Sequence, residues 1–215
     1  MRIALYTLFF ENYKPLADVV LPNWQDYADR HGYAIHYHCG KPEDFGSRPI
    51  GFQKMQYVYD ELFLKDNPYD VVWVLDLDIL VTNFNTRVED FLDHTHDYFV
   101  TTGVHGLCNG SFFLKKSDVS RRIIEYMLEN KHGYDNEQNM LKCHLDDPLL
   151  RGHIRLFPYY AFSSLLFELY PERAHLTCFE KPWRCGDFVL HLAAVPLEKR
   201  LAIFQSQIIR DSIIK

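Results

Sequence analysis

The stretch that decides the fold is "YDVVWVLDLDILVTN", Tyr69 to Asn83. Val71–Leu75 is apolar without interruption, which predicts a strand buried on both faces of a sheet. Asp76 and Asp78 follow directly, where that strand leaves the sheet. In an extended backbone, residues two apart point to the same side. The stretch therefore predicts two carboxylates that face one site at the carboxyl end of a central strand.

The segments before this strand alternate between strand and helix patterns. We predict strands over 2–8 and 34–40, and helices over 22–33 and 52–66. The first helix is expected to stop at Gly32, a residue typical of helix ends. The order strand, helix, strand, helix, strand predicts an α/β fold with a mostly parallel central sheet flanked by helices.

The second half of the chain has a more mixed pattern. Strands are predicted over 97–104, 110–117, 153–158 and 188–195, and helices over 118–130, 135–145 and 196–215. We interpret the whole chain, 1–215, as a single domain with a boundary near residue 83. Residues 1–83 form the expected nucleotide-binding half, and residues 84–215 the half for the donor sugar and the acceptor.

Composition narrows the function classes. The chain has 215 residues, of which 47% are hydrophobic and 15% aromatic, enough for a large core. The net charge of −6 and the lack of a Lys/Arg cluster exclude nucleic acid as the main partner. Five dispersed cysteines favour reduced thiols. With no signal peptide and no apolar run of about 18 residues, we expect a soluble, cytoplasmic protein without a membrane span.

The two aspartates have two possible explanations. Two unpaired carboxylates that lie close together repel, and one is forced to take up a proton. A divalent cation removes that cost, and oxygen ligands suit Mn²⁺ or Mg²⁺, which can then hold a diphosphate. The alternative is a pair of solvated aspartates in a loop at the end of a strand.

Six segments in order resemble one enzyme family. "WVLDLDILVTN" resembles the DxD segment of GT-A glycosyltransferases, in particular the family of yeast α-galactosyl- and α-mannosyltransferases and plant xyloglucan xylosyltransferases. The other five segments are "NWQDYADRHGY", "FQKMQYV", "CNGSFFLKKS", "DNEQNML" and "GDFVLHLAAV". The short chain is also similar to glycosyltransferase domains of chlorella viruses. The resemblance implies a GT-A (Rossmann-like) fold, a UDP-sugar donor and a glycan acceptor.

Two departures from that family stand out. Its eukaryotic members usually carry a membrane anchor and a stem, and this sequence shows neither. The family often has a glycine in the segment after the histidine, where this chain has Ala194. That difference leaves the histidine in place but puts the contour of the acceptor side in doubt.

The resemblance implies three protein ligands for the cation. Asp76 and Asp78 match the two DxD aspartates, of which Asp78 is the firmer metal ligand and Asp76 also reaches the ribose. His191 matches the third ligand. By the residues alone, a lone histidine in the apolar run "FVLHLAA" is more often a satisfied core residue, so that interpretation stays open.

Donor-binding residues are expected on both sides of the aspartates. Lys54 and Arg48 could meet the phosphates, and Thr7, at the end of the first strand, could bond a uracil edge. The alternatives are surface cations and a strand-end threonine. The resemblance places Asn109, Gly110 and Ser111 beside the donor sugar; the alternative is a plain turn. His105 is a further candidate for the pocket.

The helix over 135–145 is expected to face the reacting sugar. The resemblance gives Asp135 and Gln138 catalytic roles and Glu137 a substrate contact. Asp135 could instead be only the N-cap of this helix.

The expected reaction is metal-assisted transfer of a sugar from UDP, with the anomeric configuration retained as the resemblance implies. Alternatives are a non-catalytic module that binds sugar nucleotides or glycans, and a DxD aspartyl phosphatase. The phosphatase motif normally lies near the first strand with Thr or Val two residues after the second aspartate, where this chain has Leu80.

Overall fold

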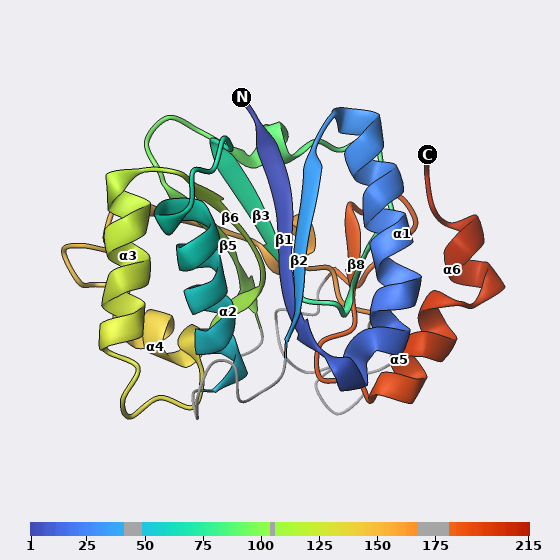
Figure 1. The fold of residues 1–215 in the computed structure, drawn as a ribbon. Helices are drawn as coiled ribbons and strands as arrows, with labels where there is room; N and C mark the ends of the chain where they lie inside the picture. Colours follow the sequence, from blue (N-terminus) through green and yellow to red (C-terminus); the bar gives the residue numbers. More distant parts are fainter. Residues whose placement is uncertain (41–48, 104–105, 167–180) are drawn as a thin grey trace.

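A mixed six-stranded sheet forms the centre of the described structure (Figure 1). The computed structural model describes residues 1–40, 49–103, 106–166 and 181–215. The strand order is β2-β1-β3-β6-β5-β7. The bounds are β1 Ile3–Phe10, β2 Ala34–Gly40, β3 Val71–Leu75, β5 Tyr98–Gly103, β6 Gly106–Lys115 and β7 Ile154–Phe157.

The pairing directions differ between the two halves of the chain. β1 pairs in parallel with β2 and with β3, as the alternating strand and helix pattern predicts. β6 pairs antiparallel with β3 and with β5, and β7 pairs in parallel with β5. The first half is therefore a parallel α/β unit, and the second half extends its sheet in mixed directions.

A short two-stranded sheet was not predicted. β4, Ile79–Val81, pairs antiparallel with β8, Val189–His191, and Ile79 stands opposite His191. Residues 77 and 78 form a turn between β3 and β4. The expectation that the two aspartates share an extended backbone was therefore wrong, because the apolar residues after Asp78 belong to a second strand. β4 nevertheless brings the DxD segment next to His191.

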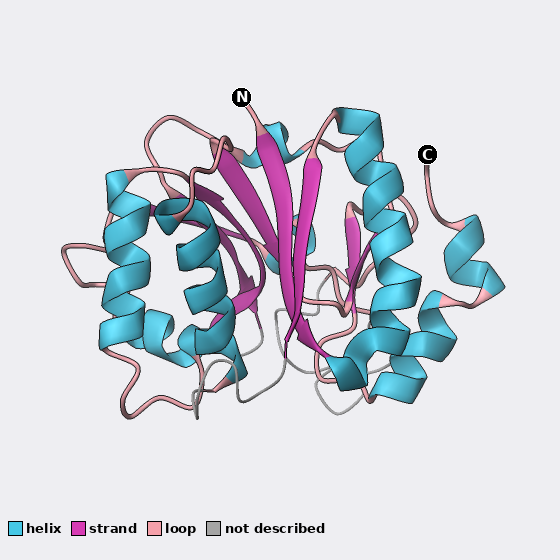
Figure 2. Cartoon of the chain, in the orientation of Figure 1, coloured by secondary structure: helices cyan, strands magenta, loops and turns pink. Residues whose placement is uncertain are grey.

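Six α-helices appear in the described residues (Figure 2). Their bounds are α1 Lys14–His31, α2 Ile50–Tyr59, α3 Asp118–Glu129, α4 Glu137–Cys143, α5 Leu197–Phe204 and α6 Gln207–Asp211. α2 continues as a π-helical turn over Asp60–Leu64. Short 3₁₀ turns cover Glu11–Tyr13, Val88–Phe91 and Tyr159–Ala161.

The helices cover both faces of the sheet. Alternate residues of β1 and β3 pack against α1 on one face and against α2, α3 and α4 on the other, which gives two hydrophobic cores. The pattern is typical of a sheet buried on both sides. Figure 1 shows α1 and α5 together on one side and α2, α3 and α4 on the other. All five residues of β3 are buried, as predicted.

Two helix predictions need correction. α1 begins at Lys14, well before the predicted start, because Pro15 is tolerated in a first turn. Its predicted end is confirmed, since Gly32 has a φ of 71°. The predicted helix over 196–215 is broken. α5 ends at Phe204, and Ser206 caps α6 by accepting a hydrogen bond from the Ile209 amide.

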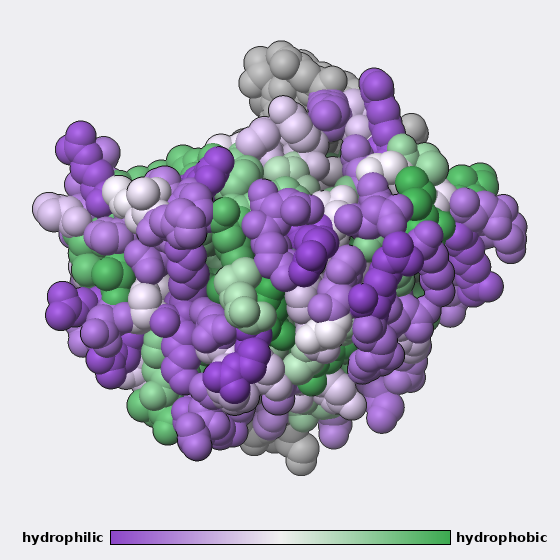
Figure 3. Space-filling view, turned by 90° about the horizontal axis from the view of Figure 1, so that it is seen from above, coloured by the Kyte–Doolittle hydropathy of each residue, from purple (hydrophilic) through white to green (hydrophobic). Residues whose placement is uncertain are grey.

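The surface at the amino end of β1 is mainly hydrophilic, with hydrophobic residues in small patches (Figure 3). Within the described residues, every helix is too short or too polar to cross a bilayer. The pocket described below lies at the other end of β1.

Candidate active site

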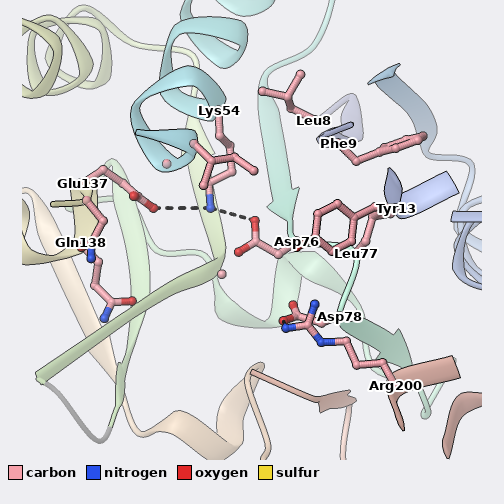
Figure 4. Close-up of a pocket in the computed structure, with 14 residues that line it drawn as sticks. Leu8, Phe9, Tyr13, Lys54, Asp76, Leu77, Asp78, Glu137, Gln138 and Arg200 are labelled. Carbon is pink, nitrogen blue, oxygen red and sulfur yellow. Dashed lines mark hydrogen bonds and ion pairs between the residues drawn. The ribbon is translucent and has the colours of Figure 1, made fainter. Parts of the chain in front are cut away.

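A pocket of about 350 Å³ lies at the carboxyl ends of β1 and β3 (Figure 4). This is where open α/β sheets bind ligands. Both DxD aspartates reach it, as the sequence predicts. Its walls are formed by Leu8, Phe9, Tyr13, Ile50, Gly51, Lys54, Asp76, Leu77, Asp78, Gly110, Asn136, Glu137, Gln138 and Arg200.

Asp76 is held by a buried lysine. Lys54 Nζ lies 2.9 Å from Asp76 Oδ1 and donates to the Asn109 carbonyl at 2.9 Å. It also lies 3.5 Å from Glu137 Oε1. Burial alone would lower the pKa of Lys54, but the carboxylates of Asp76 and Glu137 raise it above its usual value. Lys54 is therefore a permanent cation whose hydrogen-bond donors already have partners.

Glu137 supports Lys54 from the opposite side. Its side chain is 7% exposed and accepts a hydrogen bond from Asn109 Nδ2 at 3.2 Å. A Cβ atom at Gly51 would lie 1.5 Å from Glu137 Oε2, so only glycine permits this packing. Glu137 therefore contacts α2 and the lysine, and this arrangement explains why a carboxylate can be buried there.

Asp78 is held by a histidine and an arginine. His191 Nε2 lies 3.2 Å from Asp78 Oδ1, and Arg200 Nη2 lies 3.0 Å from Asp78 Oδ2. Burial would raise the pKa of the Asp78 carboxyl, but His191 and Arg200 together lower it. Arg200 Nε also donates to the Leu192 carbonyl at 3.2 Å. Asp78 is thus ionised and fixed.

Arg200 was missed by the sequence analysis. It lies on α5, in the segment 196–215 that was predicted only as a helix, and it belongs to none of the motifs. One signal was available in the sequence. Arg200 is a cation that lies nine residues after the candidate metal ligand His191, near the start of the next predicted helix. Its contact with Asp78 depends on how α5 packs beside β8.

His191 is buried, at 2% exposure, and its ring is fixed on both sides. Nδ1 lies 2.7 Å from Ser163 Oγ and 3.7 Å from Cys108 Sγ. Burial would lower the pKa of His191, but Asp78 and Cys108 raise it to about 10. Both ring nitrogens of this buried histidine thus have a polar neighbour, Ser163 on one side and the Asp78 carboxylate on the other, so the interpretations as a core histidine and as a metal ligand both remain open.

The residues present fit a divalent cation. Asp78 Oδ1 is buried and accepts no hydrogen bond. A Cβ at Gly110 would lie 3.2 Å from both Asp76 Oδ2 and His191 Nε2, so these two atoms face one small space. Two carboxylate oxygens and an imidazole nitrogen form a donor set suited to Mn²⁺.

No preformed metal cluster is present in the described part of the chain, since no group of three or more His, Cys, Asp or Glu side chains stands in ligating geometry there. Lys54 and Arg200 supply the positive charge beside the two aspartates instead. In this structure, the two cationic side chains therefore reduce the repulsion between the Asp76 and Asp78 carboxylates.

Two of the predicted sugar-facing residues lie behind the pocket. Asn109 is 1% exposed and bonds Tyr98 and Glu137. Ser111 is in the core, where its Oγ accepts from Trp73 Nε1 at 2.9 Å. The expectation that their side chains touch the donor is corrected, because β6 is central in the sheet at these positions. Gly110 does line the pocket.

Thr7 is also displaced from its predicted role. It is 1% exposed, its Oγ1 has no hydrogen-bond partner, and it does not line the pocket. Leu8, Phe9 and Tyr13 form that wall instead. The strand continues to Phe10, so the pocket edge lies beyond Thr7.

The start of α4 corrects the roles given to Asp135. Asn136 is the N-cap, since its side chain accepts from the Asn139 amide at 2.8 Å. Asp135 is exposed and is absent from the pocket wall, whereas Asn136 and Gln138 line it. Gln138 Oε1 accepts from the Asn109 amide at 3.0 Å. Arg48 and His105 lie outside the described residues.

The chain is similar to known proteins in part of its sequence and in its fold. Residues 9–97 match the model of the galactosyl transferase GMA12/MNN10 family, a stretch that contains Lys54, Asp76 and Asp78. No curated protein sequence matches the chain significantly.

Three solved structures share the fold. A glycosyltransferase involved in glycosylation of the major capsid of PBCV-1 has a TM-score of 0.73 at 16% identity, covering 95% of this chain and 99% of that one. GlyE of Streptococcus pneumoniae TIGR4 has a TM-score of 0.61 at 12% identity, covering 100% and 65%. The galactosyltransferase LgtC, solved with donor and acceptor sugar analogs, has 0.55 at 11% identity, covering 97% and 99%.

The predicted GT-A fold is confirmed by these neighbours. The family match and the fold together support a GT-A glycosyltransferase, that is, an enzyme that transfers sugars. This confirms the resemblance drawn from the ordered motifs.

Proposed function

We propose that this chain transfers a sugar from a UDP-sugar to a hydroxyl group of a glycan acceptor, with Mn²⁺ or Mg²⁺ as cofactor and with retention of anomeric configuration. The observation that carries the proposal is that Asp76 Oδ2 and His191 Nε2 face one small space beside Gly110, and that Asp78 Oδ1 lies 3.2 Å from the same Nε2. Each belongs to a side chain whose other polar atom is already bound by the protein.

Those three side chains would hold the cation. When bound, the cation supplies positive charge that neutralises the leaving diphosphate. Arg200 lies beside Asp78 in the pocket wall, so its charge acts on the same region. Lys54 adds a buried positive charge, but its ammonium group already bonds Asp76 and the Asn109 carbonyl. We therefore propose that Lys54 stabilises the diphosphate through its electrostatic field and orients Asp76, more than it bonds a phosphate directly. Arg48 remains a proposed phosphate contact.

The two ends of the pocket suggest where the donor lies. Phe9 and Tyr13 offer aromatic surface at the end of β1, which suits a nucleobase. Asn136, Gln138 and Gly110 line the opposite wall, where polar groups and a glycine allow a sugar to approach the backbone. Because Gln138 Oε1 is bound to the backbone, its amide nitrogen is the group that we propose to face the reacting carbon.

The test is release of UDP from a panel of UDP-sugars, with and without Mn²⁺, for the wild type and for Asp78→Asn. We expect Mn²⁺-dependent release from at least one donor and a loss of Mn²⁺ affinity on the order of 100-fold in Asp78→Asn. Asp26→Asn is the matched control, since Asp26 is 56% exposed and does not line the pocket. Equal release without metal would reject the cofactor. Tight UDP binding without release from any donor, even with glycan acceptors, would favour a binding module.

A further inference from the structure

We propose that Ser163 is a positioning residue that orients the His191 ring for the cation; this inference rests on the proposed metal-dependent function. Ser163 Oγ lies 2.7 Å from His191 Nδ1. Both side chains are buried, at 1% and 2% exposure, so water does not compete for this contact. Ser163 appears in none of the motifs that led to the candidate site.

The chemistry of imidazole gives the contact its meaning. A neutral ring carries one N–H and one lone pair, and the partner of one nitrogen decides the state of the other. If Nδ1–H donates to Ser163 Oγ, the lone pair is on Nε2, which is 3.2 Å from Asp78 Oδ1 and faces the space beside Gly110. A histidine that binds a metal commonly uses its second nitrogen in this way.

Cys108 extends the contact to a short chain. Its Sγ lies 3.0 Å from Ser163 Oγ and 3.7 Å from His191 Nδ1. When Ser163 accepts from the ring, its own O–H is free to donate to the Cys108 sulfur. The direction His191 to Ser163 to Cys108 therefore gives the His191 Nδ1–H and the Ser163 O–H each a partner and leaves Nε2 available.

The backbone around Ser163 also contacts β8, the strand that carries His191. The His191 amide donates to the Ser164 carbonyl at 2.7 Å, and Leu165 forms an isolated bridge with His191. The Ser163 amide donates to the Tyr159 carbonyl at 2.8 Å. One short segment thus fixes both the main chain of His191 and the rotation of its ring.

The experiment measures Mn²⁺ binding to the protein with UDP, in the absence of any sugar donor, by calorimetry. We expect Ser163→Ala to weaken Mn²⁺ binding by about 10- to 100-fold, and Ser163→Thr to restore most of it. Because Cys108 could partly replace the lost hydroxyl, the double variant Ser163→Ala/Cys108→Ala should be weaker still.

Ser164→Ala is the matched control. Ser164 is 0% exposed, and its hydroxyl bonds the Tyr160 carbonyl at 3.0 Å. We expect this variant to lose thermal stability comparably but to keep Mn²⁺ affinity. Unchanged affinity in Ser163→Ala, or an equal loss in both variants, would overturn the positioning role.

A second measurement keeps the inference testable if Ser163→Ala does not fold. In the wild-type protein with Mg²⁺ and UDP, ¹⁵N NMR of the His191 ring should show the proton on Nδ1. A proton on Nε2 would overturn the inference. If the wild type binds neither Mn²⁺ nor Mg²⁺, the proposed cofactor fails as well, which distinguishes the two failures.

Discussion

The two aspartates of the DxD stretch lie in one pocket but in two different environments. The Asp76 side is built from α2, β6 and the start of α4, where Lys54 bonds Asp76 and is backed by Glu137. The Asp78 side is built from β8 and α5, where His191 Nε2 and Arg200 Nη2 lie 3.2 Å and 3.0 Å from the two Asp78 oxygens. Asp76 is 43% exposed and Asp78 11%, measured on the side chains.

The two carboxylates therefore differ in how easily a ligand can reach them. Asp76 faces the open pocket and can reach a ligand directly, while its lysine is saturated by three partners. Asp78 is buried, with one oxygen fixed and the other without a hydrogen bond. That Asp78 is the firmer metal ligand and that Asp76 also meets the nucleotide stays a prediction, for which the two environments provide the test.

The largest effect is expected from a variant that removes Lys54, the cation on the Asp76 side of the pocket. Lys54→Met leaves Glu137 as a buried, uncompensated carboxylate, and we expect a loss of about 3 kcal/mol in the free energy of unfolding. Urea denaturation measures it. Lys54→Met/Glu137→Gln should recover much of the loss, because the remaining buried charge is removed.

Lys65→Met is the control for this prediction. Lys65 is 64% exposed and pairs with Glu61 on the surface, so its loss should change stability by less than about 1 kcal/mol. If the two lysine variants behave alike, Lys54 is not the electrostatic support of Asp76.

The second prediction concerns pH and the Asp78 side. The pKa of His191 is raised to about 10, against about 6.5 in an unfolded chain. A raised pKa stabilises the folded protein fully below pH 6.5, and this stabilisation is lost as pH rises through about 10. For the metal-free protein we expect a loss of up to about 1.4 kcal/mol per pH unit inside that window.

Denaturation of the wild type and of His191→Gln between pH 6.5 and 9.5 measures this effect. The variant should lack the histidine-linked slope, and parallel curves would contradict the assignment. The same pKa moves the expected competition between protons and Mn²⁺ to higher pH than an unperturbed histidine would predict. Affinity for Mn²⁺ should therefore still rise above pH 7.5.

The smallest effect concerns the residue that departs from the family pattern. Ala194 has a φ of 58°, a left-handed conformation that favours glycine. Ala194→Gly should remove that strain at some cost in chain entropy, for a net gain of about 0.5 kcal/mol. Ala193→Gly, next to it, should instead destabilise. Thermal melts of both variants check this, and a loss of stability in Ala194→Gly would show that the methyl group contributes packing.

Much of the architecture could be predicted from local patterns. The uninterrupted apolar run of β3 requires burial on both faces, and Gly32 marks the end of α1 because it permits a positive φ. The ordered motifs also identified Lys54, Asp76, Asp78 and Gly110, which meet in the pocket. These residues lie on or next to helices and strands whose hydrophobic patterns are clear enough to predict where each element begins and ends.

The roles of individual side chains were predicted poorly where a shift of one position along the chain changes which residue faces the pocket. Asp135 and Asn136 are equally good helix caps by composition, and the structure uses Asn136, which leaves Asp135 exposed. Asn109 and Ser111 were expected at the sugar, but their side chains turn into the protein on either side of Gly110.

By itself, the sequence determined the alternating elements, the buried central strand and the place where its carboxylates emerge, because hydrophobic periodicity acts over neighbouring residues. Only the tertiary structure decided which groups meet those carboxylates. Arg200 reaches Asp78, and Ser163 reaches His191, through the pairing of β8 with β4 and the packing of α5. Such contacts join residues far apart in the chain, and their strength depends on distance and burial, which local sequence patterns do not encode.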